Sequence, residues 1–289
     1  MKQFLLQAEF DNNGMIRLDG KDYHYLVNVR RLAAGECFPA LSPNGEEVLI
    51  KIVSINKKML TGMRIIDPPD SSPNSSSAPQ TVKLQDRCSM SIYENEFKII
   101  LFQALPKGDK MDLIVRQAAE GGIAEIVPFT AEFSIGKGNT DGQKFQRWER
   151  IIKEARQQSG SKIATRLHHI LSIDELLNYW KELRNTQSEK PQDDSPQNNS
   201  SSILGLLFHH EKALENNSLH GYLCSYPRIT IVVIGPEGGF SEREVSLFKE
   251  NDFKMITIGD TVLRTETAAL YFTAAVRTLL LEKNSWEQK

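Results

Sequence analysis

The chain has 289 residues, of which 40% are hydrophobic and 25% are charged, and its formal net charge is -2 at pH 7. This length suits two soluble domains, and the charge balance excludes a nucleic-acid binder that relies on a basic surface overall, so an anionic partner must meet a local patch. No apolar run reaches the roughly eighteen residues of a membrane span, and the first residues lack the pattern of a secretory signal. We therefore expect a cytoplasmic protein with no membrane partner.

The cysteines are few and widely separated. Cys37, Cys88 and Cys224 form no CxxC pair. Structural zinc sites draw on closely spaced thiols, and a sparse, odd count is typical of a reducing compartment. We therefore expect no bound metal.

The first part of the chain is rich in short strand-like runs. These runs cover residues 15–18, 47–53 and 60–66, and one helical piece covers residues 21–32. Asn44-Gly45 lies between two of the runs and is a strong hairpin-turn signal. Residues 1–70 are therefore predicted to form a small β-barrel with one helix.

Two polar stretches interrupt the chain. Pro and Ser dominate DPPDSSPNSSSAPQ, residues 67–80, within which we assign residues 71–80 to a linker. The second stretch, TQSEKPQDDSPQNNSSS, covers residues 186–202 and is predicted to be a disordered insertion. This insertion falls inside a second domain, residues 81–289.

Strand-like and helix-like runs alternate in the second domain. This alternation, with strands rich in apolar residues, predicts an α/β domain whose mostly parallel sheet is covered on both faces. The expected strands are residues 97–104, 125–129, 204–208, 229–234 and 254–258, and the expected helices are residues 110–121, 144–160, 241–251 and 267–283.

A glycine-rich loop follows the strand at residues 229–234. Its sequence is Gly235-Pro236-Glu237-Gly238-Gly239, and the next helix starts at Ser241, where Glu244 completes a capping box. Loops at the carboxyl ends of parallel strands bind ligands. The spacing differs from a phosphate-binding loop, and the carboxylate of Glu237 repels bare polyphosphate, whereas it suits a ligand with a ribose and a positive charge, such as S-adenosylmethionine. The alternative is that the glycines only make a tight turn.

A second loop repeats this layout. A strand ends at Ile258, and a helix is expected to begin near Thr265–Thr267, with a hydroxyl able to cap it. Arg264 lies at the junction, and its guanidinium can clamp a phosphate or stabilise negative charge on a base oxygen. The alternative is a surface ion pair of Arg264 with Glu237 or Glu266.

Basic residues gather between Lys144 and Leu167. This stretch contains seven Lys and Arg residues but only two Glu residues. At helical spacing, Arg147, Arg150 and Lys153 fall along one side. RNA binding needs such a positive patch, although a solvated helix face is the alternative.

At the two loops the sequence resembles the 16S ribosomal RNA (uracil-N3)-methyltransferase family, RsmE, of the SPOUT superfamily. The similarity rests on IGPEGGFS, residues 234–241, followed by LRTETA, residues 263–268. It continues in LPKGDKM, residues 105–111, and in residues 147–160 and 24–32, and so spans nearly the whole chain. The chain departs from the family at three positions where the family carries basic residues, namely Gln117, Ser161 and Thr261.

The resemblance implies a SPOUT-type parallel sheet with a C-terminal trefoil knot, preceded by a PUA-like, RNA-binding β-barrel. It also implies a homodimer, S-adenosylmethionine as the cofactor, and ribosomal RNA or the small ribosomal subunit as the partner. The donor pocket would be built by three loops, with the residues Leu207, Phe208, Ile234, Gly235, Glu237, Gly238, Gly239, Ile258, Gly259, Val262, Leu263, Thr267 and Ala268. The predicted RNA-binding residues are Arg30, Arg31, Lys107, Arg147, Arg150, Lys153 and Arg156.

The chemistry implied by this family assigns a role to Arg264. Methylation at uracil N3 requires loss of the N3 proton, and Arg264 placed against the flanking carbonyl oxygens would stabilise the anion. Positioning and electrostatics would then supply most of the rate, and Glu237 and His209 are the candidates if a dedicated base acts. The alternatives are a non-catalytic member of the same fold that binds S-adenosylmethionine and RNA, a SPOUT methyltransferase acting on another RNA nucleotide, and another α/β enzyme with a different nucleotide ligand.

Overall fold

The protein divides into two compact units. The smaller comprises residues 1–82 with 153–164, and the larger comprises residues 83–152 with 165–289. The predicted linker and most of the predicted insertion lie outside the described residues. The computed structural model describes residues 4–43, 45–65, 97–134, 142–188, 203–209, 218–257 and 261–282.

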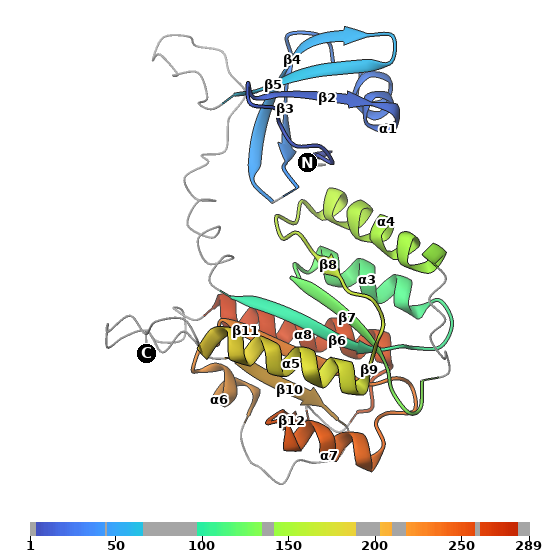
Figure 1. The fold of residues 1–289 in the computed structure, drawn as a ribbon, viewed down its shortest axis with the longest axis vertical. Coiled ribbons are helices and arrows are strands. Elements are labelled where there is room, and N and C mark those ends of the chain that lie inside the picture. Colours follow the sequence, from blue (N-terminus) through green and yellow to red (C-terminus); the bar gives the residue numbers. More distant parts are fainter. Residues whose placement is uncertain are drawn as a thin grey trace, which may run out of the picture. The chain divides into compact units, whose positions relative to one another are not determined.

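The described part of the smaller unit is built around a five-stranded sheet in the order β1-β3-β4-β5-β2 (Figure 1). Alternate residues of β4, such as Val48, Ile50 and Ile52, are buried, as expected for a strand with one face on a core. The predicted strands and helical piece of the small β-barrel are present, while the closure of the barrel and its bounds at residues 1–70 stay predictions. Its strands are β1 (Phe4–Leu5), β2 (Met15–Asp19), β3 (Cys37–Leu41), β4 (Glu47–Asn56) and β5 (Met59–Ile65).

Two further predictions for this unit concern a hairpin turn at Asn44-Gly45 and a helix over residues 21–32. The predicted turn is present at Gly45, which has a φ of 85°, but it joins β4 to β3, a strand that was not predicted, whereas the predicted run at residues 15–18 pairs with β5; Asn44 lies outside the described residues. The predicted helix over residues 21–32 is wrong at its end. Helix α1 (Gly20–Tyr23) continues into the π-helix η1 (His24–Val29) and stops there. Arg31 has a φ of 56°, outside the helical region, so the helix cannot continue through it.

The larger unit contains a sheet of seven strands among its described residues, in the order β12-β10-β11-β6-β7-β8, with β9 also paired to β7. Each of these pairs is parallel, which confirms the predicted type of sheet. The trefoil knot is not tested by this pairing and stays a prediction. The strands are β6 (Lys98–Ala104), β7 (Glu125–Thr130), β8 (Arg166–Leu167), β9 (Leu171–Ser172), β10 (Ile203–Phe208), β11 (Ile229–Ile234) and β12 (Lys254–Ile256).

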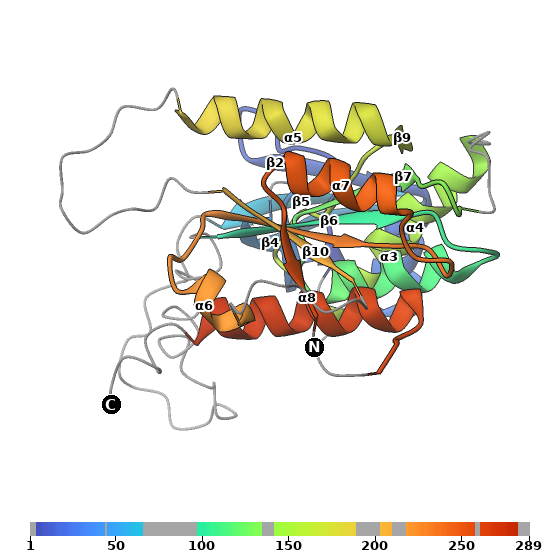
Figure 2. The same cartoon turned by 90° about the horizontal axis from the view of Figure 1, so that it is seen from below.

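Helices cover both faces of this sheet. Figure 2 shows α5 and α7 over one face and α3 and α8 over the other, so β11 is buried along its whole length. Helix α5 takes in the first residues of the predicted insertion, which are therefore helical rather than disordered. The helices are α3 (Lys110–Glu120), α4 (Gly142–Ser159), α5 (Ile173–Ser188), α6 (Leu219–Leu223), α7 (Glu242–Glu250) and α8 (Thr265–Leu281).

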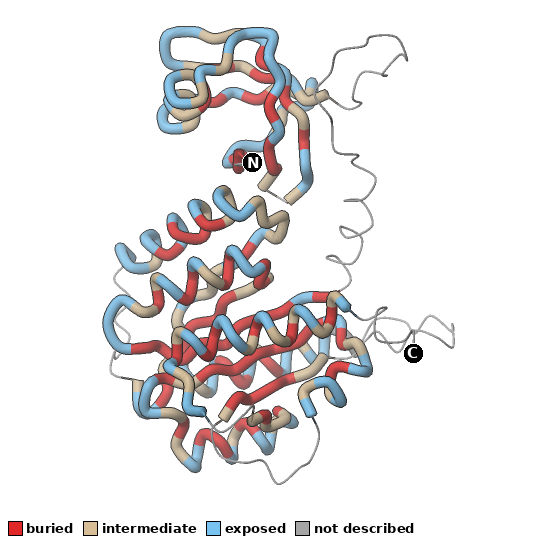
Figure 3. Tube along the Cα trace, turned by 180° about the vertical axis from the view of Figure 1, so that it is seen from behind, coloured by how far each residue is buried: buried red, intermediate tan, exposed pale blue. Residues whose placement is uncertain are grey.

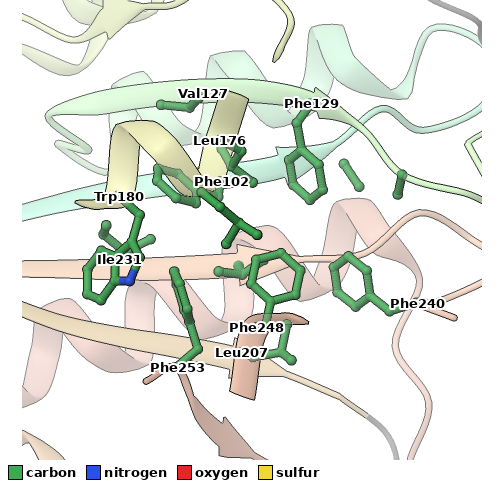
Figure 4. Close-up of a cluster of buried hydrophobic side chains, with 14 of the residues drawn as sticks. Phe102, Val127, Phe129, Leu176, Trp180, Leu207, Ile231, Phe240, Phe248 and Phe253 are labelled. Carbon is green, nitrogen blue, oxygen red and sulfur yellow. The ribbon is translucent and has the colours of Figure 1, made fainter. Parts of the chain in front are cut away.

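The main core lies between the sheet and helices α5 and α7. Aromatic side chains dominate it, among them Phe102, Phe129, Phe248 and Trp180 (Figure 4). The Trp180 indole N–H donates to the Asn251 carbonyl over 2.8 Å, so its one polar atom is satisfied. Figure 3 shows the strands buried while the outer sides of the covering helices are exposed. This packing holds the sheet rigid and thereby fixes the strand ends from which the loops leave.

Candidate functional site

The two predicted loops follow β11 and β12, which have β10 between them in the sheet, and on its other side the glycine loop has the β6–α3 loop as a neighbour. β11 pairs with β6, and Ile234 at the end of β11 lies opposite Gln103 near the end of β6. Because the strands are parallel, the loops that follow them emerge at the same edge. The glycine loop at residues 235–239 and the β6–α3 loop at residues 105–109 are therefore neighbours.

The glycine loop has a defined shape. Gly239 has a φ of 72°, which favours glycine, and its N–H donates to the Pro236 carbonyl over 3.0 Å. At Gly238 a Cβ would lie 2.8 Å from the Cβ of Phe133, so this position has no room for a side chain unless Phe133 moves. The predicted capping box of Ser241 and Glu244 is present. The turn and the helix start are thus both fixed by local contacts.

A buried hydroxyl joins the two predicted loops. Thr265, the first residue of α8, donates from Oγ1 to the Gly235 carbonyl over 2.7 Å. The same oxygen accepts from Gln103 Nε2 over 3.1 Å, and Gln103 also donates to the Ala104 carbonyl over 2.8 Å. The expected hydroxyl cap near Thr265–Thr267 is wrong, because Arg264 occupies the N-cap without a side-chain cap bond and the Thr265 hydroxyl binds Gly235 instead.

A lysine that the sequence reasoning did not single out lies in the same region. Lys110 Nζ lies 2.7 Å from Glu237 Oε1 and 3.5 Å from Glu266 Oε2. The backbone N–H of Lys107 donates to both carboxylate oxygens of Glu237, over 3.2 and 3.1 Å. The hydrogen bond to Glu237 raises the pKa of Lys110. Partial burial favours the protonated form of Glu237, but the bonds from Lys110 and Lys107 outweigh it and lower the pKa of Glu237, so both groups stay charged.

Arg264 remains available to a ligand. Its side chain is exposed and, within the described part of the chain, makes neither a hydrogen bond nor an ion pair. The alternative that Arg264 pairs with Glu237 or Glu266 is therefore wrong, because Lys110 occupies both carboxylates.

The other predicted donor-binding residues differ in exposure. Leu207 belongs to the core cluster beneath α5 and α7 and lies inside the sheet, opposite Val233 of β11 and Met255 of β12. The ring of Phe208 stacks on Phe272 of α8, with centroids 4.0 Å apart. Ala268 is buried and Leu263 is half-buried, whereas Thr267 and Val262 are exposed, the latter by 75%. Ile258 and Gly259 lie outside the described residues.

The third predicted loop, which follows β10, is bound to the neighbouring strand β12. The N–H of His209 donates to the Ile256 carbonyl over 3.1 Å.

Part of the predicted RNA-binding set is engaged within the protein. In the larger unit Arg147 forms an ion pair with Asp112, which also accepts from the Trp148 indole over 3.0 Å. In the smaller unit Lys153 lies 4.0 Å from Asp22. The predicted row along α4 is therefore not a uniformly free face.

The remaining predicted RNA-binding residues differ in how far they are buried. Burial lowers the pKa of Arg156, and its Nε and Nη2 atoms are buried without a hydrogen-bond partner among the described residues. Arg30 is half-buried and Arg31 is exposed. Lys107 and Arg150 are exposed as well.

The described residues provide neither a cluster of metal ligands nor a membrane-spanning helix. In the described ranges, no group of three or more His, Cys, Asp or Glu side chains is placed to hold a metal ion. None of the helices formed by the described residues has both the length and the apolar character needed to cross a membrane.

Two polar residues of the site could have been noticed in the sequence. Gln103 stands inside an otherwise apolar strand, and Lys110 begins a helix next to the carboxyl end of that strand. A buried polar side chain needs a hydrogen-bond partner, so a glutamine in this strand indicated a polar contact inside the fold. The partners themselves, Thr265, Glu237 and Glu266, lie far along the chain and only the fold reveals them.

Known proteins share both units. A family model described as RNA methyltransferase domain matches residues 93–277, and one described as RNA methyltransferase PUA domain matches residues 18–62. Ribosomal RNA small subunit methyltransferase E 2 of Borreliella burgdorferi is 29% identical, over 98% of this chain and 100% of that protein. Ribosomal RNA small subunit methyltransferase E of Bacillus subtilis is 25% identical, over 94% and 93%. The crystal structure of ribosomal RNA small subunit methyltransferase E from Neisseria gonorrhoeae bound to S-adenosyl methionine has a TM-score of 0.67 at 21% identity, covering 96% of this chain and 98% of that one.

Proposed function

The chain belongs to the RNA methyltransferase family whose domain model it matches, and from this premise we propose that it transfers the methyl group of S-adenosylmethionine to N3 of a uridine in small-subunit (16S) ribosomal RNA. The observation that carries the proposal is the hydrogen bond from Thr265 to Gly235, which draws the two loops together beside Arg264, a residue without an ion pair among the described residues. The names of the curated relatives support the choice of RNA.

The charges at the site suit this donor. Lys110, Glu237 and Glu266 together contribute one positive and two negative groups, so the cluster attracts a sulfonium rather than a polyphosphate. The bound donor would supply an electrophilic methyl group. Backbone groups of residues 235–239 and the residues around Leu263 and Ala268 would hold its nucleoside part.

Arg264 is the catalytic residue of the proposal. Its exposed guanidinium would lie against the carbonyl oxygens that flank N3 and favour loss of the N3 proton. Glu237 has a lowered pKa and is held by Lys110 and Lys107, which makes it a weak base and a good anchor for the glycine loop. The chain therefore contributes positioning and electrostatic stabilisation rather than a strong base.

The finer features of the proposal concern assembly and RNA contact. A homodimer is supported by large apolar side chains exposed on neighbouring helices, Leu113 on α3 and Leu270 and Tyr271 on α8. The smaller unit would bind RNA, as the description of the matching PUA model suggests. The trefoil knot and a cytoplasmic location complete the proposal.

Methyl transfer to ribosomal particles tests the function. We expect the protein to transfer a labelled methyl group to small-subunit particles from cells that lack it, with the label at N3 of one uridine. Arg264→Ala should reduce turnover by about 10²-fold or more while the calorimetric Kd for S-adenosylmethionine stays within about 2-fold. Arg243→Ala, at an exposed arginine of α7, is the matched control and should behave as the wild type. Absence of transfer by the wild type, as a non-catalytic member would show, contradicts the proposal.

A further inference from the structure

Glu237 and Glu266 belong to the two segments that meet where Thr265 binds Gly235, next to Arg264 in the chain. Glu266 is two residues further on in the first turn of α8, and Glu237 lies in the loop whose Gly235 is bound by Thr265, the neighbour of Arg264. An arginine guanidinium binds a carboxylate through two parallel hydrogen bonds, which makes it a strong competitor for either group. Arg264 nevertheless has no ion pair within the described residues.

Lys110 accounts for this absence. Its Nζ lies 2.7 Å from Glu237 and 3.5 Å from Glu266, so one ammonium compensates both carboxylates. Glu266 Oε2 is buried and accepts no hydrogen bond among the described residues. Without Lys110 this oxygen would be a buried charge without a partner among the described residues, which is costly, and Arg264 is a cation only two residues before it, at the N-cap of the same helix.

The position of Lys110 in its helix supports a role beyond stability. Lys110 is the first residue of α3, where the helix dipole disfavours a positive charge. A lysine there weakens the helix unless acidic groups from elsewhere compensate it. Both of its acidic partners come from the loop and helix that carry the proposed donor site.

We propose that Lys110 is a positioning residue that occupies Glu237 and Glu266 and thereby keeps Arg264 free to act on the RNA base. The inference deepens the proposed function, and it rests on that function for the effect on turnover. Its structural part, the pairing state of Arg264, does not depend on which reaction the protein performs.

The test uses the full chain and follows Arg264 by nitrogen-15 NMR of its side-chain Nε–H, assigned by the loss of the signal in Arg264→Lys. In the wild type we expect fast exchange of this proton with water. In Lys110→Met exchange should slow by about 10-fold, because Glu266 now binds the guanidinium. Turnover should fall by roughly 10-fold or more, since loss of one such donor costs about 10²–10³-fold.

In the lysine variant Glu237 keeps the bonds from the Lys107 N–H, so Glu266 is the carboxylate that is released, and removing its charge should reverse the effect. Lys110→Met combined with Glu266→Gln should restore fast exchange and recover most of the turnover, and Lys110→Arg should keep turnover within about 3-fold of the wild type. Lys181→Met, at an exposed lysine of α5, is the matched control. If Lys110→Met fails to fold, Lys110→Gln takes its place in both measurements.

Two outcomes overturn the inference. One is unchanged Arg264 exchange in the lysine variant, and the other is a loss of turnover that Glu266→Gln does not recover, as a purely structural lysine would give. If the wild type transfers no methyl group to RNA, the proposed function fails, and the NMR measurement still decides whether Lys110 keeps Arg264 unpaired.

Discussion

At the scale of single residues, the site depends on polar side chains that find partners far along the chain. Thr265 binds Gly235, Gln103 binds Thr265, and Lys110 joins Glu237. Each of these contacts links segments that follow different strands. A single substitution can therefore separate the two loops while the sheet beneath them stays intact.

Thr265→Val keeps the shape of the side chain but removes its hydroxyl. The Gly235 carbonyl then loses its bond from the hydroxyl, and the Gln103 amide keeps its bond to the Ala104 carbonyl but loses the one to Thr265, so we expect the free energy of unfolding to fall by about 1–3 kcal/mol. Donor binding should weaken as well, because the loops are no longer joined. Urea denaturation and calorimetric titration with S-adenosylmethionine measure the two effects. Thr278→Val, at an exposed threonine of the same helix, should change neither, and equal behaviour of the two variants would refute the role of the hydroxyl.

Glu125 gives a prediction about pH. Its carboxylate lies 2.6 Å from His168 Nε2 and accepts from the Tyr179 hydroxyl over 2.8 Å. The bond with His168 does most to lower the pKa of Glu125 below its ordinary value of 4.5, burial opposes it, and Tyr179 adds to it. Because the folded-state pKa is lowered, the stabilisation is present above pH 4.5 and is lost as the pH falls through the folded value.

Glu125→Gln should therefore reduce the free energy of unfolding by about 1–3 kcal/mol at neutral pH, and the difference from the wild type should shrink under acid conditions. Denaturation curves over a series of pH values measure it. Glu120→Gln, at an exposed glutamate of α3, is the control. A difference that is constant across the series would show that the charge of Glu125 is irrelevant.

At the scale of elements, the strands and helices follow local patterns that the sequence shows directly. β11 is buried throughout and apolar except for Thr230 because it is covered on both faces, and the start of α7 follows from the Ser241 capping box. The predictions failed where a contact with a residue distant in the chain, or an unusual backbone conformation, determines the local structure. Thr265 binds Gly235 rather than capping its helix, and the left-handed Arg31 ends η1 early. The two-residue strands β8 and β9 are too short to show a periodicity.

The capping box allows a clean comparison within one helix. Ser241→Ala removes the bond from the Glu244 N–H and should cost about 1 kcal/mol of stability. Ser246→Ala removes a bond to the Glu242 carbonyl in the middle of α7, where alanine is the better helix former, so it should be neutral or slightly stabilising. Thermal or urea denaturation distinguishes them. Equal costs for the two serines would mean that the cap does not fix the helix start.

At the scale of the whole molecule, sequence patterns give the two-part organisation but not every boundary. Residues 153–164, placed in the second domain by composition, group with the smaller unit, where Lys153 meets Asp22 and Lys162 lies 3.4 Å from Glu47. No local pattern could assign this segment, because its partners lie more than 100 residues earlier in the chain.

The proposed homodimer makes a prediction at this scale. Leu270 and Tyr271 are 42% and 51% exposed next to each other on α8, and adjoining exposed apolar side chains are a feature of protein–protein contact sites. We expect light scattering to give twice the chain mass of 32.7 kDa, and Leu270→Glu with Tyr271→Glu to give a single chain. Val53→Glu, at an exposed valine of β4, should leave the mass unchanged. A wild-type protein that stays monomeric at micromolar concentration would refute the dimer.

The central claim is that the loops after β11 and β12 together hold the methyl donor. A crystal structure of the protein grown with S-adenosylmethionine tests it most directly. We predict density for the nucleoside between residues 235–239 and residues 261–268, with the methyl group facing the side on which Arg264 is exposed. Density at another place, or a space between these loops filled by protein side chains, would contradict the claim.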